Sequence, residues 1–375
     1  MPDLETVDFG DEPADESITA LEKKYSKQMR EIVSQKIDLP ISTLPSMIKD
    51  QINLNPDFQR RGRWDREQQS RFIESIIMNV PVPPVFLGED QYGMYVVLDG
   101  RQRLTAINEF LKNNYKLKSL EVWSDLDGHN FNDLQKKRLD KMITRRFVPA
   151  IIILKESTPQ VKYDVFDRLN TGGVIADPME IRNAVFQGEF NKLIRSLSET
   201  KMFRQLWEIP SDPELLEKNG LYRRMEDLEL VLRFFALLHY QDMDMNYKDY
   251  LSDFMDSRNA RYQEKPDLRA QDQELFTRAV TNSWEIFGPR AFRKPGQDGK
   301  ESKKSAPLAD AVMISLAEAD PKLVQMHGAE IRKAFTALVT ENEEFKKAIA
   351  TGTNGKGAIR TRIELAKRAV NNILQ

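Results

Sequence analysis

A strand, a tight turn and a helix follow one another within residues 93–111, and this unit places the strongest constraint on the fold. Tyr95–Leu98 is a short apolar run rich in β-branched residues, which predicts a buried strand. Asp99-Gly100 is a turn pair, because glycine adopts backbone angles that are closed to other residues. From residue 101 onward, apolar side chains recur at helical spacing, at Leu104, Ile107, Phe110 and Leu111. The sequence therefore predicts a strand that turns directly into a helix.

The junction between this strand and this helix concentrates polar residues that suit an anion. A helix start presents unpaired backbone N–H groups and a partial positive charge, and both favour phosphate. Arg101 and Arg103 add fork-shaped, charge-assisted donors, and Asp99 offers a carboxylate for a metal ion or a water molecule. The alternative is an ordinary turn in which Asp99 only caps the helix and the arginines are solvated. This stretch by itself leaves both interpretations open.

A basic loop earlier in the chain is a second candidate for a phosphate site. Residues 59–63 include three arginines, and the loop leads through Trp64 into a helix. Asp65 is the expected N-cap of that helix, and Gln68 three residues later completes a capping box. One apolar face of the helix docks it on a core, which holds the loop in place from behind. A basic surface loop beside a buried Trp64 is the alternative.

Other segments predict a mixed fold followed by helices. A hairpin is expected to join a strand after the prolines of residues 80–84 to Tyr95–Leu98, and further strands are expected at residues 37–44, 117–122 and 147–154. A helix over residues 158–169 ends at Asn170-Thr171-Gly172-Gly173, and Asp177 opens the next with a proline and a capping glutamate. Beyond about residue 190 the strand pattern disappears, and helical periodicity appears near residues 225–240, 271–287, 306–319, 328–339 and 357–374.

Composition limits the class of protein. The chain of 375 residues is long enough for two domains, and 40% hydrophobic with 30% charged residues is a globular balance. Cysteine is absent, which excludes disulfides and thiolate chemistry. With no bilayer-length apolar run and no secretory signal, we expect a cytoplasmic protein without membrane contact. The divisions expected are an acidic arm over residues 1–30 that lacks order, a mixed domain over 31–190 and a helical domain over 191–375.

The net charge of −2 gives no global attraction to nucleic acid, so any such contact must use a local patch. A glycine- and lysine-rich loop in the helical region is the best local candidate for DNA phosphates, through Arg290, Arg293, Lys294, Lys303 and Lys304. A second cluster is either a solvated helix face or a nucleic-acid patch, and it comprises Lys136, Lys137, Arg138, Lys141, Arg145 and Arg146.

The sequence lacks the motifs of several common kinds of catalytic site. A Walker-type glycine loop is absent, which argues against ordinary P-loop ATP hydrolysis. His129, His239 and His327 are isolated and lack metal-ligand spacing. Neither a zinc site nor a Ser-His-Asp triad is therefore expected.

Taken in order, five motifs resemble one family. They are Phe58-Gln59-Arg60 with Trp64, Ile73-Glu74-Ser75-Ile76, Pro81-Val82-Pro83-Pro84, Asp99-Gly100-Arg101-Gln102-Arg103-Leu104-Thr105, and Phe166-Asp167-Arg168-Leu169-Asn170-Thr171-Gly172-Gly173. This order resembles the N-terminal domain of GmrSD-type, modification-dependent restriction systems, which an Asp-Gly-Gln-Gln-Arg box marks. Arg101 stands where the family usually has glutamine. The resemblance covers about residues 37–190, and nothing in residues 191–375 resembles the C-terminal His-Asn-His nuclease domain of many relatives.

The resemblance implies an α+β fold like that of ParB and sulfiredoxin, with a small mixed sheet and helices that bind a nucleotide. It implies that the protein binds a nucleoside triphosphate together with Mg²⁺. It also implies that hydrolysis of this nucleotide is coupled to DNA restriction or phage defence. The catalytic candidates are then Asp99, which is also the candidate metal ligand, and Gln102. The nucleotide-binding candidates are Gln59, Arg60, Gly100, Arg101, Arg103, Thr105 and Asn170.

Three functions compete at this point. The first is nucleotide-dependent defence, and the second is a non-enzymatic DNA-binding or regulatory module that recruits a separate nuclease. Direct nuclease activity is the weakest, because no second acidic motif accompanies Asp99 at a suitable spacing. DNA, a separate nuclease or methyltransferase subunit and a second copy of the chain are the partners to be expected.

Overall fold

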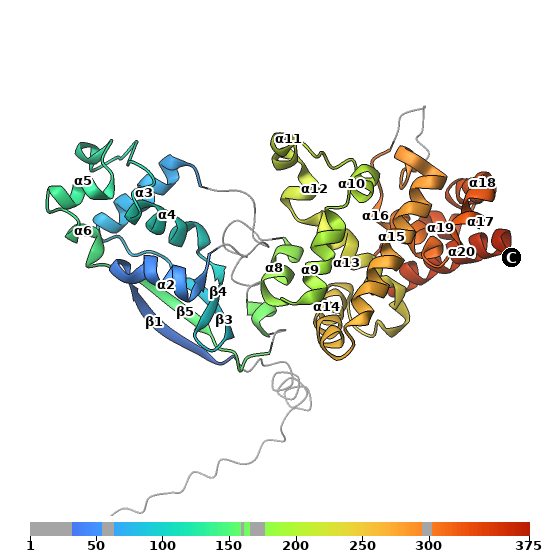
Figure 1. Cartoon of the computed structure of the whole chain (residues 1–375), viewed down its shortest axis with the longest axis horizontal. Coiled ribbons are helices and arrows are strands. Elements are labelled where there is room, and N and C mark those ends of the chain that lie inside the picture. The colour runs from blue at the N-terminus through green and yellow to red at the C-terminus, as the bar shows by residue number, and fades with distance from the viewer. Residues whose placement is uncertain (1–31, 55–63, 159–160, 166–176, 295–301) are drawn as a thin grey trace, which may run out of the picture.

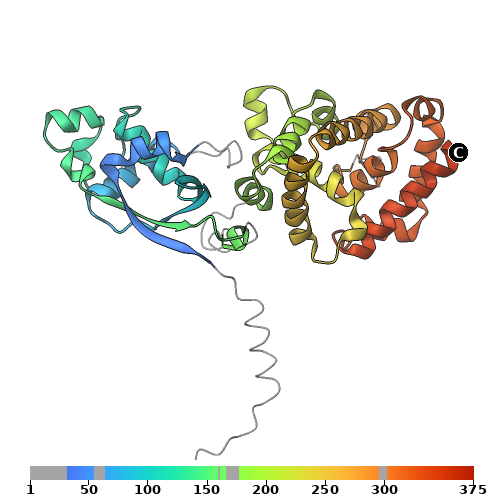
Figure 2. The same ribbon diagram turned by 60° about the horizontal axis from the view of Figure 1, so that its bottom comes forward.

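A computed structural model describes residues 32–54, 64–158, 161–165, 177–294 and 302–375. Figures 1 and 2 show two lobes, the first built around a sheet and the second built from helices. The predicted α+β class, with a small mixed sheet followed by a helical region, is confirmed. In the described ranges, no helix combines the length and the apolar composition that a membrane span requires.

The first lobe alternates short strands and helices. In chain order its elements are β1 (Ser34–Pro40), η1 (Ile41–Thr43), α2 (Leu44–Asp50), β2 (Ile52–Asn53), α3 (Arg66–Ile77), β3 (Val85–Gln91), β4 (Met94–Asp99), α4 (Arg101–Leu111), η2 (Ser124–Leu126), α5 (Phe131–Lys136), α6 (Lys141–Thr144) and β5 (Phe147–Ile153).

The five strands form one mixed sheet in the order β1-β5-β3-β4-β2. β3 pairs antiparallel with β4 through the predicted hairpin, and it pairs parallel with β5. β1 closes one edge antiparallel to β5, and β2 closes the other edge parallel to β4. The prolines of residues 80–84 precede β3, which is central, so they do not interrupt its ladder.

The two faces of the sheet pack against different partners. On one face, Val85, Val97 and Ile152 belong to a core shared with Leu104 of α4 and Ile73 of α3. The opposite face carries Leu98 and Ile153, which belong to the large core of the helical lobe. Alternation along β4 therefore places neighbouring residues of one strand in two separate cores.

Local sequence signals explain most of these boundaries. Asp65 and Gln68 form the predicted capping box at the start of α3. The strand expected over residues 117–122 is wrong, because this segment makes local contacts in place of a ladder. Leu117 N donates to His129 O, and Gly128 N donates back to Leu117 O, each at 2.9 Å or less. Residues 117–122 therefore form a loop.

The helical lobe begins with α8. Its elements are α8 (Pro178–Val185), α9 (Glu189–Ser198), α10 (Lys201–Trp207), α11 (Pro213–Lys218), α12 (Gly220–Arg223), α13 (Glu226–Leu238), η4 (Tyr240–Asp242), α14 (Tyr247–Glu264), α15 (Asp267–Phe287), η5 (Gly288–Arg290), α16 (Ala306–Leu316), α17 (Pro321–Met326), α18 (Gly328–Thr340), α19 (Glu343–Ala348) and α20 (Lys356–Leu374).

α8 starts with Asp177 at the N-cap position and a proline in its first turn, as expected, but the Asp177 side chain makes no capping hydrogen bond. α8 is held in the helical lobe by Arg182, which is 1% exposed. The Arg182 guanidinium donates to Glu229 Oε2 at 3.2 Å and to Lys248 O at 3.1 Å. α8 thus belongs to the core of the helical lobe, whereas the domain boundary expected near residue 190 stays a prediction.

A buried ionic cluster crosses the helical lobe. Asp310 of α16 is 5% exposed and accepts from Arg233 of α13, at 3.2 Å through Nε and 2.6 Å through Nη2. Arg362 of α20 donates to the same carboxylate at 2.8 Å. One acidic side chain therefore accepts from two buried arginines and links three helices.

Glu74 of α3 holds a loop of the first lobe through hydrogen bonds from backbone N–H groups. Its side chain is 5% exposed, and it accepts from the backbone N–H groups of Glu121 at 3.2 Å and of Val122 and Trp123 at 2.8 Å each. Burial raises the pKa of the Glu74 carboxyl, but these donors lower it by more, so its pKa lies below the ordinary value of 4.5.

We expect Glu74→Gln to lower the free energy of unfolding by about 1–3 kcal/mol at neutral pH, because the amide cannot accept from all three N–H groups. A depressed folded-state pKa stabilises the fold above the unfolded-state value and ceases to do so as pH falls through the folded-state value. The gap between wild type and variant should therefore shrink below pH 4.5 in urea unfolding. Glu121→Gln, whose exposed carboxylate pairs with Arg71, is the control. A gap that stays constant with pH would contradict the prediction.

Candidate functional site

The turn between β4 and α4 depends on Gly100. This residue is the N-cap of α4 and has a φ of +91°, a conformation that L side chains rarely adopt. An added Cβ would lie 2.5 Å from Val85 Cγ1 and 2.9 Å from Val85 Cβ, at the start of β3. Glycine is therefore required at this position for two reasons, the backbone angle and the close approach of β3.

Arg103 braces the same turn. Its guanidinium donates to the Pro83 and Pro84 carbonyl oxygens and pairs with the Asp99 carboxylate. The Arg103 side chain is 13% exposed and that of Asp99 is 39% exposed. The arginine that the sequence predicts at a phosphate thus connects the chain before β3 to the end of β4, and the Asp99 carboxylate remains accessible to solvent.

Gln102 connects the start of α4 to Trp64, just before α3. Its Oε1 accepts from the backbone N–H of Trp64 at 3.1 Å. Trp64 is half-buried, and its ring makes an edge contact with Phe72 of α3 at a centroid distance of 5.5 Å. Trp64 is therefore anchored at the first turn of α4, whereas the basic residues that precede it lie outside the described residues.

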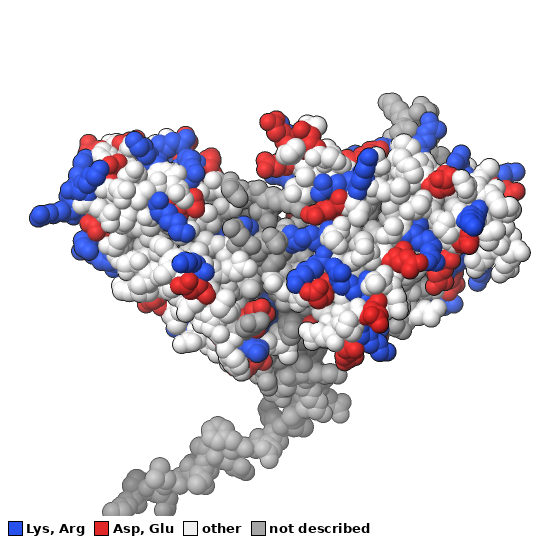
Figure 3. Space-filling model, in the orientation of Figure 1, with Lys and Arg blue, Asp and Glu red and all other residues white. Residues whose placement is uncertain are grey.

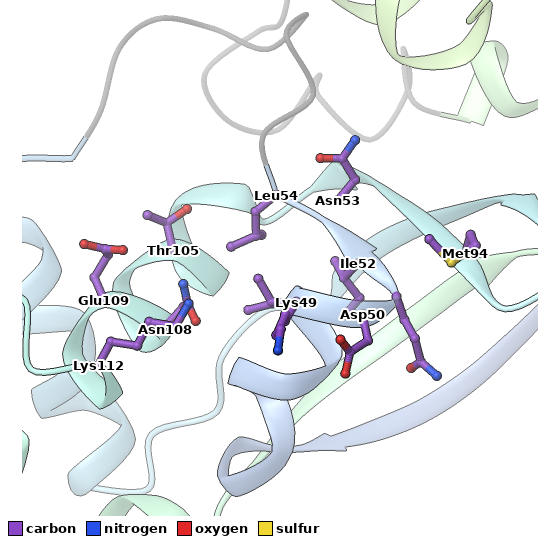
Figure 4. Close-up of a pocket in the computed structure, with 12 residues that line it drawn as sticks. Lys49, Asp50, Ile52, Asn53, Leu54, Met94, Thr105, Asn108, Glu109 and Lys112 are labelled. Atoms are coloured by element: carbon purple, nitrogen blue, oxygen red, sulfur yellow. The ribbon is translucent and has the colours of Figure 1, made fainter.

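One face of α4 borders a pocket of about 550 Å³ (Figure 4). Arg101 and Thr105 lie one turn apart, and the same face continues through residues 108 and 112. Figure 4 shows α4 on one wall and the α2–β2 segment on the other. The α4 wall consists of Thr105, Asn108, Glu109 and Lys112, and the opposite wall includes Lys49, Asp50, Asn53 and Leu54.

Asn108 is the unusual member of this pocket. It is 6% exposed, and its Oδ1 is buried without a hydrogen-bond partner among the described residues. A buried acceptor that lacks a donor costs roughly 1–3 kcal/mol, so such a group in a pocket wall favours a ligand or a water molecule that donates to it. Its spacing of seven residues from Arg101 is the sequence signal that could have identified it.

The structure brings together most, but not all, of the predicted site residues. Asp99, Gly100, Arg101, Gln102 and Arg103 form the junction, and Thr105 lies in the pocket one turn along α4. Gln59, Arg60 and Asn170 lie outside the described residues. The catalytic and nucleotide-binding roles assigned to all of these residues stay predictions.

The loop proposed for DNA binding uses its cations within the protein. Arg293 donates to both oxygens of Glu208, at 2.6 and 2.8 Å, and Lys304 donates to Pro289 O at 2.8 Å. Lys294 donates to Ile349 O at 2.8 Å, and burial lowers the pKa of its ammonium group. Arg290 and Lys303 are exposed. DNA contact by these five residues stays a prediction, and three of them already stabilise the loop.

Metal binding has limited support from the protein side chains. Throughout the described ranges, no group of three or more His, Asp or Glu side chains is placed to hold a metal ion. Mg²⁺ is commonly bound by one or two carboxylates together with substrate phosphates and water. The accessible carboxylate of Asp99 fits a Mg²⁺ ion that arrives with a triphosphate, and does not by itself make a site formed by protein alone.

Comparison with known proteins agrees with the order of the motifs. Residues 41–187 match the family model described as GmrSD restriction endonuclease, N-terminal domain. No curated protein and no solved structure matches the chain. The matched segment contains β3, β4, α4 and the pocket, while the helices from α9 onward lie outside it. Residues 41–187 of this chain are therefore a domain of the GmrSD N-terminal family.

Proposed function

We propose that this domain binds a nucleoside triphosphate along α4 as part of a DNA restriction or phage-defence system. The phosphates lie at the start of α4 beside Gly100 and Arg101, and the nucleoside enters the pocket beside Thr105 and Asn108. The match of residues 41–187 to a restriction-system family supports a role in DNA restriction or phage defence. The proposal that the ligand is a nucleotide rests on the geometry of α4.

The observation that carries this proposal is the shared face of α4. Arg101 and Asn108 are seven residues apart, which corresponds to about 10 Å along a helix. That length suits a triphosphate and its nucleoside laid along the helix. The Arg101 end offers charge for phosphate, and the Asn108 end offers a buried amide oxygen for the amino group of a base.

The residues at the junction have separate tasks in this proposal. Gly100 has no side chain to cap the first-turn amides of α4, so phosphate oxygens approach them directly. Arg103 is a positioning residue that fixes Asp99, and Asp99 holds the Mg²⁺ that accompanies the nucleotide. When bound, the ion supplies charge neutralisation to the phosphates. Gln102 links the nucleotide site to Trp64, just before α3.

Binding without turnover is the second candidate. The observation that favours it is that Gln102 Oε1 accepts from Trp64 and Asp99 pairs with Arg103, so both catalytic candidates already serve protein contacts. The domain then senses a nucleotide and recruits a separate nuclease. Release of inorganic phosphate, measured with saturating nucleotide and Mg²⁺, separates hydrolysis from binding alone.

We expect Arg101→Ala to weaken triphosphate binding by about 1.5–3 kcal/mol, because a charge-assisted hydrogen bond is lost. This corresponds to roughly tenfold to more than a hundredfold in Kd. Arg101→Gln restores the residue usual in the family and keeps a neutral donor, so it should lose less affinity than Arg101→Ala. Isothermal titration with ATP, GTP, CTP and UTP in the presence of Mg²⁺ measures both variants.

Arg71→Ala is the matched control, because it removes the same charge from an exposed position on α3. It should leave the affinity for nucleotide unchanged. Absence of binding by the wild-type chain to all four triphosphates would refute the proposed function. Equal affinity of wild type and Arg101→Ala would remove Arg101 from the site.

A further inference from the structure

We propose that the basic face formed by α5, α6 and the turn between them binds the phosphate backbone of duplex DNA. This inference rests on the restriction setting of the proposed function, but it does not depend on nucleotide binding. Residues 131–146 contain six basic and two acidic residues, whereas the whole chain has a formal net charge of −2. Figure 3 shows Lys and Arg atoms gathered at the end of the first lobe where α5 and α6 lie.

The cations of this face differ from those of the loop near residue 293. Lys136, Arg138 and Arg145 are exposed, and none has an acidic partner within 4 Å among the described residues. Lys141, whose side chain is 79% exposed, pairs with the 18% exposed carboxylate of Asp140 at 3.7 Å, and a pair open to solvent on one side contributes about 0–1 kcal/mol. Contact with phosphate therefore requires these side chains to give up almost no internal interaction.

The shape and lining of the surface also suit a nucleic-acid backbone. A hollow of about 540 Å³ lies between η1, α5 and α6, and Lys141 and Arg145 border it one helical turn apart. Its walls include the polar side chains of Ser42, Gln135 and Thr144. Hydroxyl and amide groups accompany Lys and Arg in most contacts to DNA phosphates, and a cluster of cations on one face is the electrostatic signature of such a surface.

The face is held rigidly, which reduces the entropy lost on binding. Asn130 and Asp133 form a capping box at the start of α5. Asn132 N donates to Asn113 Oδ1 at 2.6 Å, which attaches α5 to the end of α4. Ile41 N donates to Arg146 O at 3.0 Å, which attaches the end of α6 to η1.

The test is duplex binding by the full chain, measured by fluorescence anisotropy over a range of salt concentrations. The probe is a labelled duplex of arbitrary sequence, about two helical turns long. For Lys141→Gln/Arg145→Gln, we expect affinity near 0.1 M salt to fall roughly tenfold or more. The slope of log affinity against log salt should decrease in magnitude by about two, because each phosphate contact contributes about 0.9.

Lys322→Gln/Lys333→Gln is the matched control, since it removes the same charge from exposed positions on α17 and α18. It should leave the salt slope unchanged. Unchanged binding by Lys141→Gln/Arg145→Gln, no binding of the duplex by wild type, or a preference of this face for RNA or single strands would each overturn the inference. Nucleotide titration of the same variant is expected to match wild type, so failure of this surface is distinguishable from failure of the proposed function.

Discussion

Gly100→Ala is expected to lower the free energy of unfolding of the first lobe by about 2–5 kcal/mol, from left-handed backbone strain and overpacking together. The new Cβ would lie 2.5 Å from Val85 Cγ1, and its φ of +91° is unfavourable for alanine. Relief requires β3 to move away from the turn, which would also displace the proline carbonyls that Arg103 binds. Calorimetry of the full chain should show a lower midpoint for the transition of this lobe.

Gly93→Ala separates the two contributions. Gly93 also has a positive φ, of +75°, but nothing lies within 4 Å of a Cβ added there. This variant should therefore show backbone strain alone, about 1–2 kcal/mol. Equal effects of the two substitutions would mean that the contact with Val85 relaxes without cost.

Asp310→Asn is expected to destabilise the helical lobe by about 3–5 kcal/mol, because removing one member of a buried ionic cluster leaves uncompensated charge. Arg233 is 7% exposed and Arg362 is 0% exposed, so neither guanidinium can turn to water without disrupting the packing. Asparagine is similar in volume to aspartate, which limits the change to charge and hydrogen bonding. Urea unfolding followed by far-ultraviolet circular dichroism measures the loss.

Glu274→Gln is the control for the loss of a carboxylate. Glu274 pairs with Arg278 one turn away on α15, and its side chain is 72% exposed. Exposed pairs of this kind contribute about 0.3–0.5 kcal/mol. A loss at Asp310 no larger than that at Glu274 would show that Arg233 and Arg362 find other partners.

Local signals in the sequence were sufficient for much of the first lobe. The capping box at Asp65, the hairpin before β4 and the glycine turn at residue 100 each depend on residues close together in the chain. Such features follow from local physical chemistry and are confirmed. The parallel pairing of β3 with β5 joins segments about sixty residues apart, and no local pattern specifies it.

The same distinction applies to the candidate site. The sequence identified the junction residues, but it did not show that Arg103 would bind Pro83 and Pro84, because that contact depends on the path of β3. It also did not identify Asn108, whose role appears only when α2 and β2 form the opposite wall of the pocket. The sequence did not predict helix α14, because its own aromatic and charged residues are spread around the helix and leave no clear apolar face.

The sharing of one sheet between two cores bears on how this protein can be divided. A fragment that ends at residue 187 would keep α8 but remove Glu229, Ser252 and Lys248, the partners of Arg182. It would also remove most members of the large core to which Leu98 and Ile153, on the second face of the sheet, belong. The segment that matches the family model, residues 41–187, is therefore smaller than the unit that folds here, and to fold alone it would need a helical partner that supplies equivalent acceptors for Arg182.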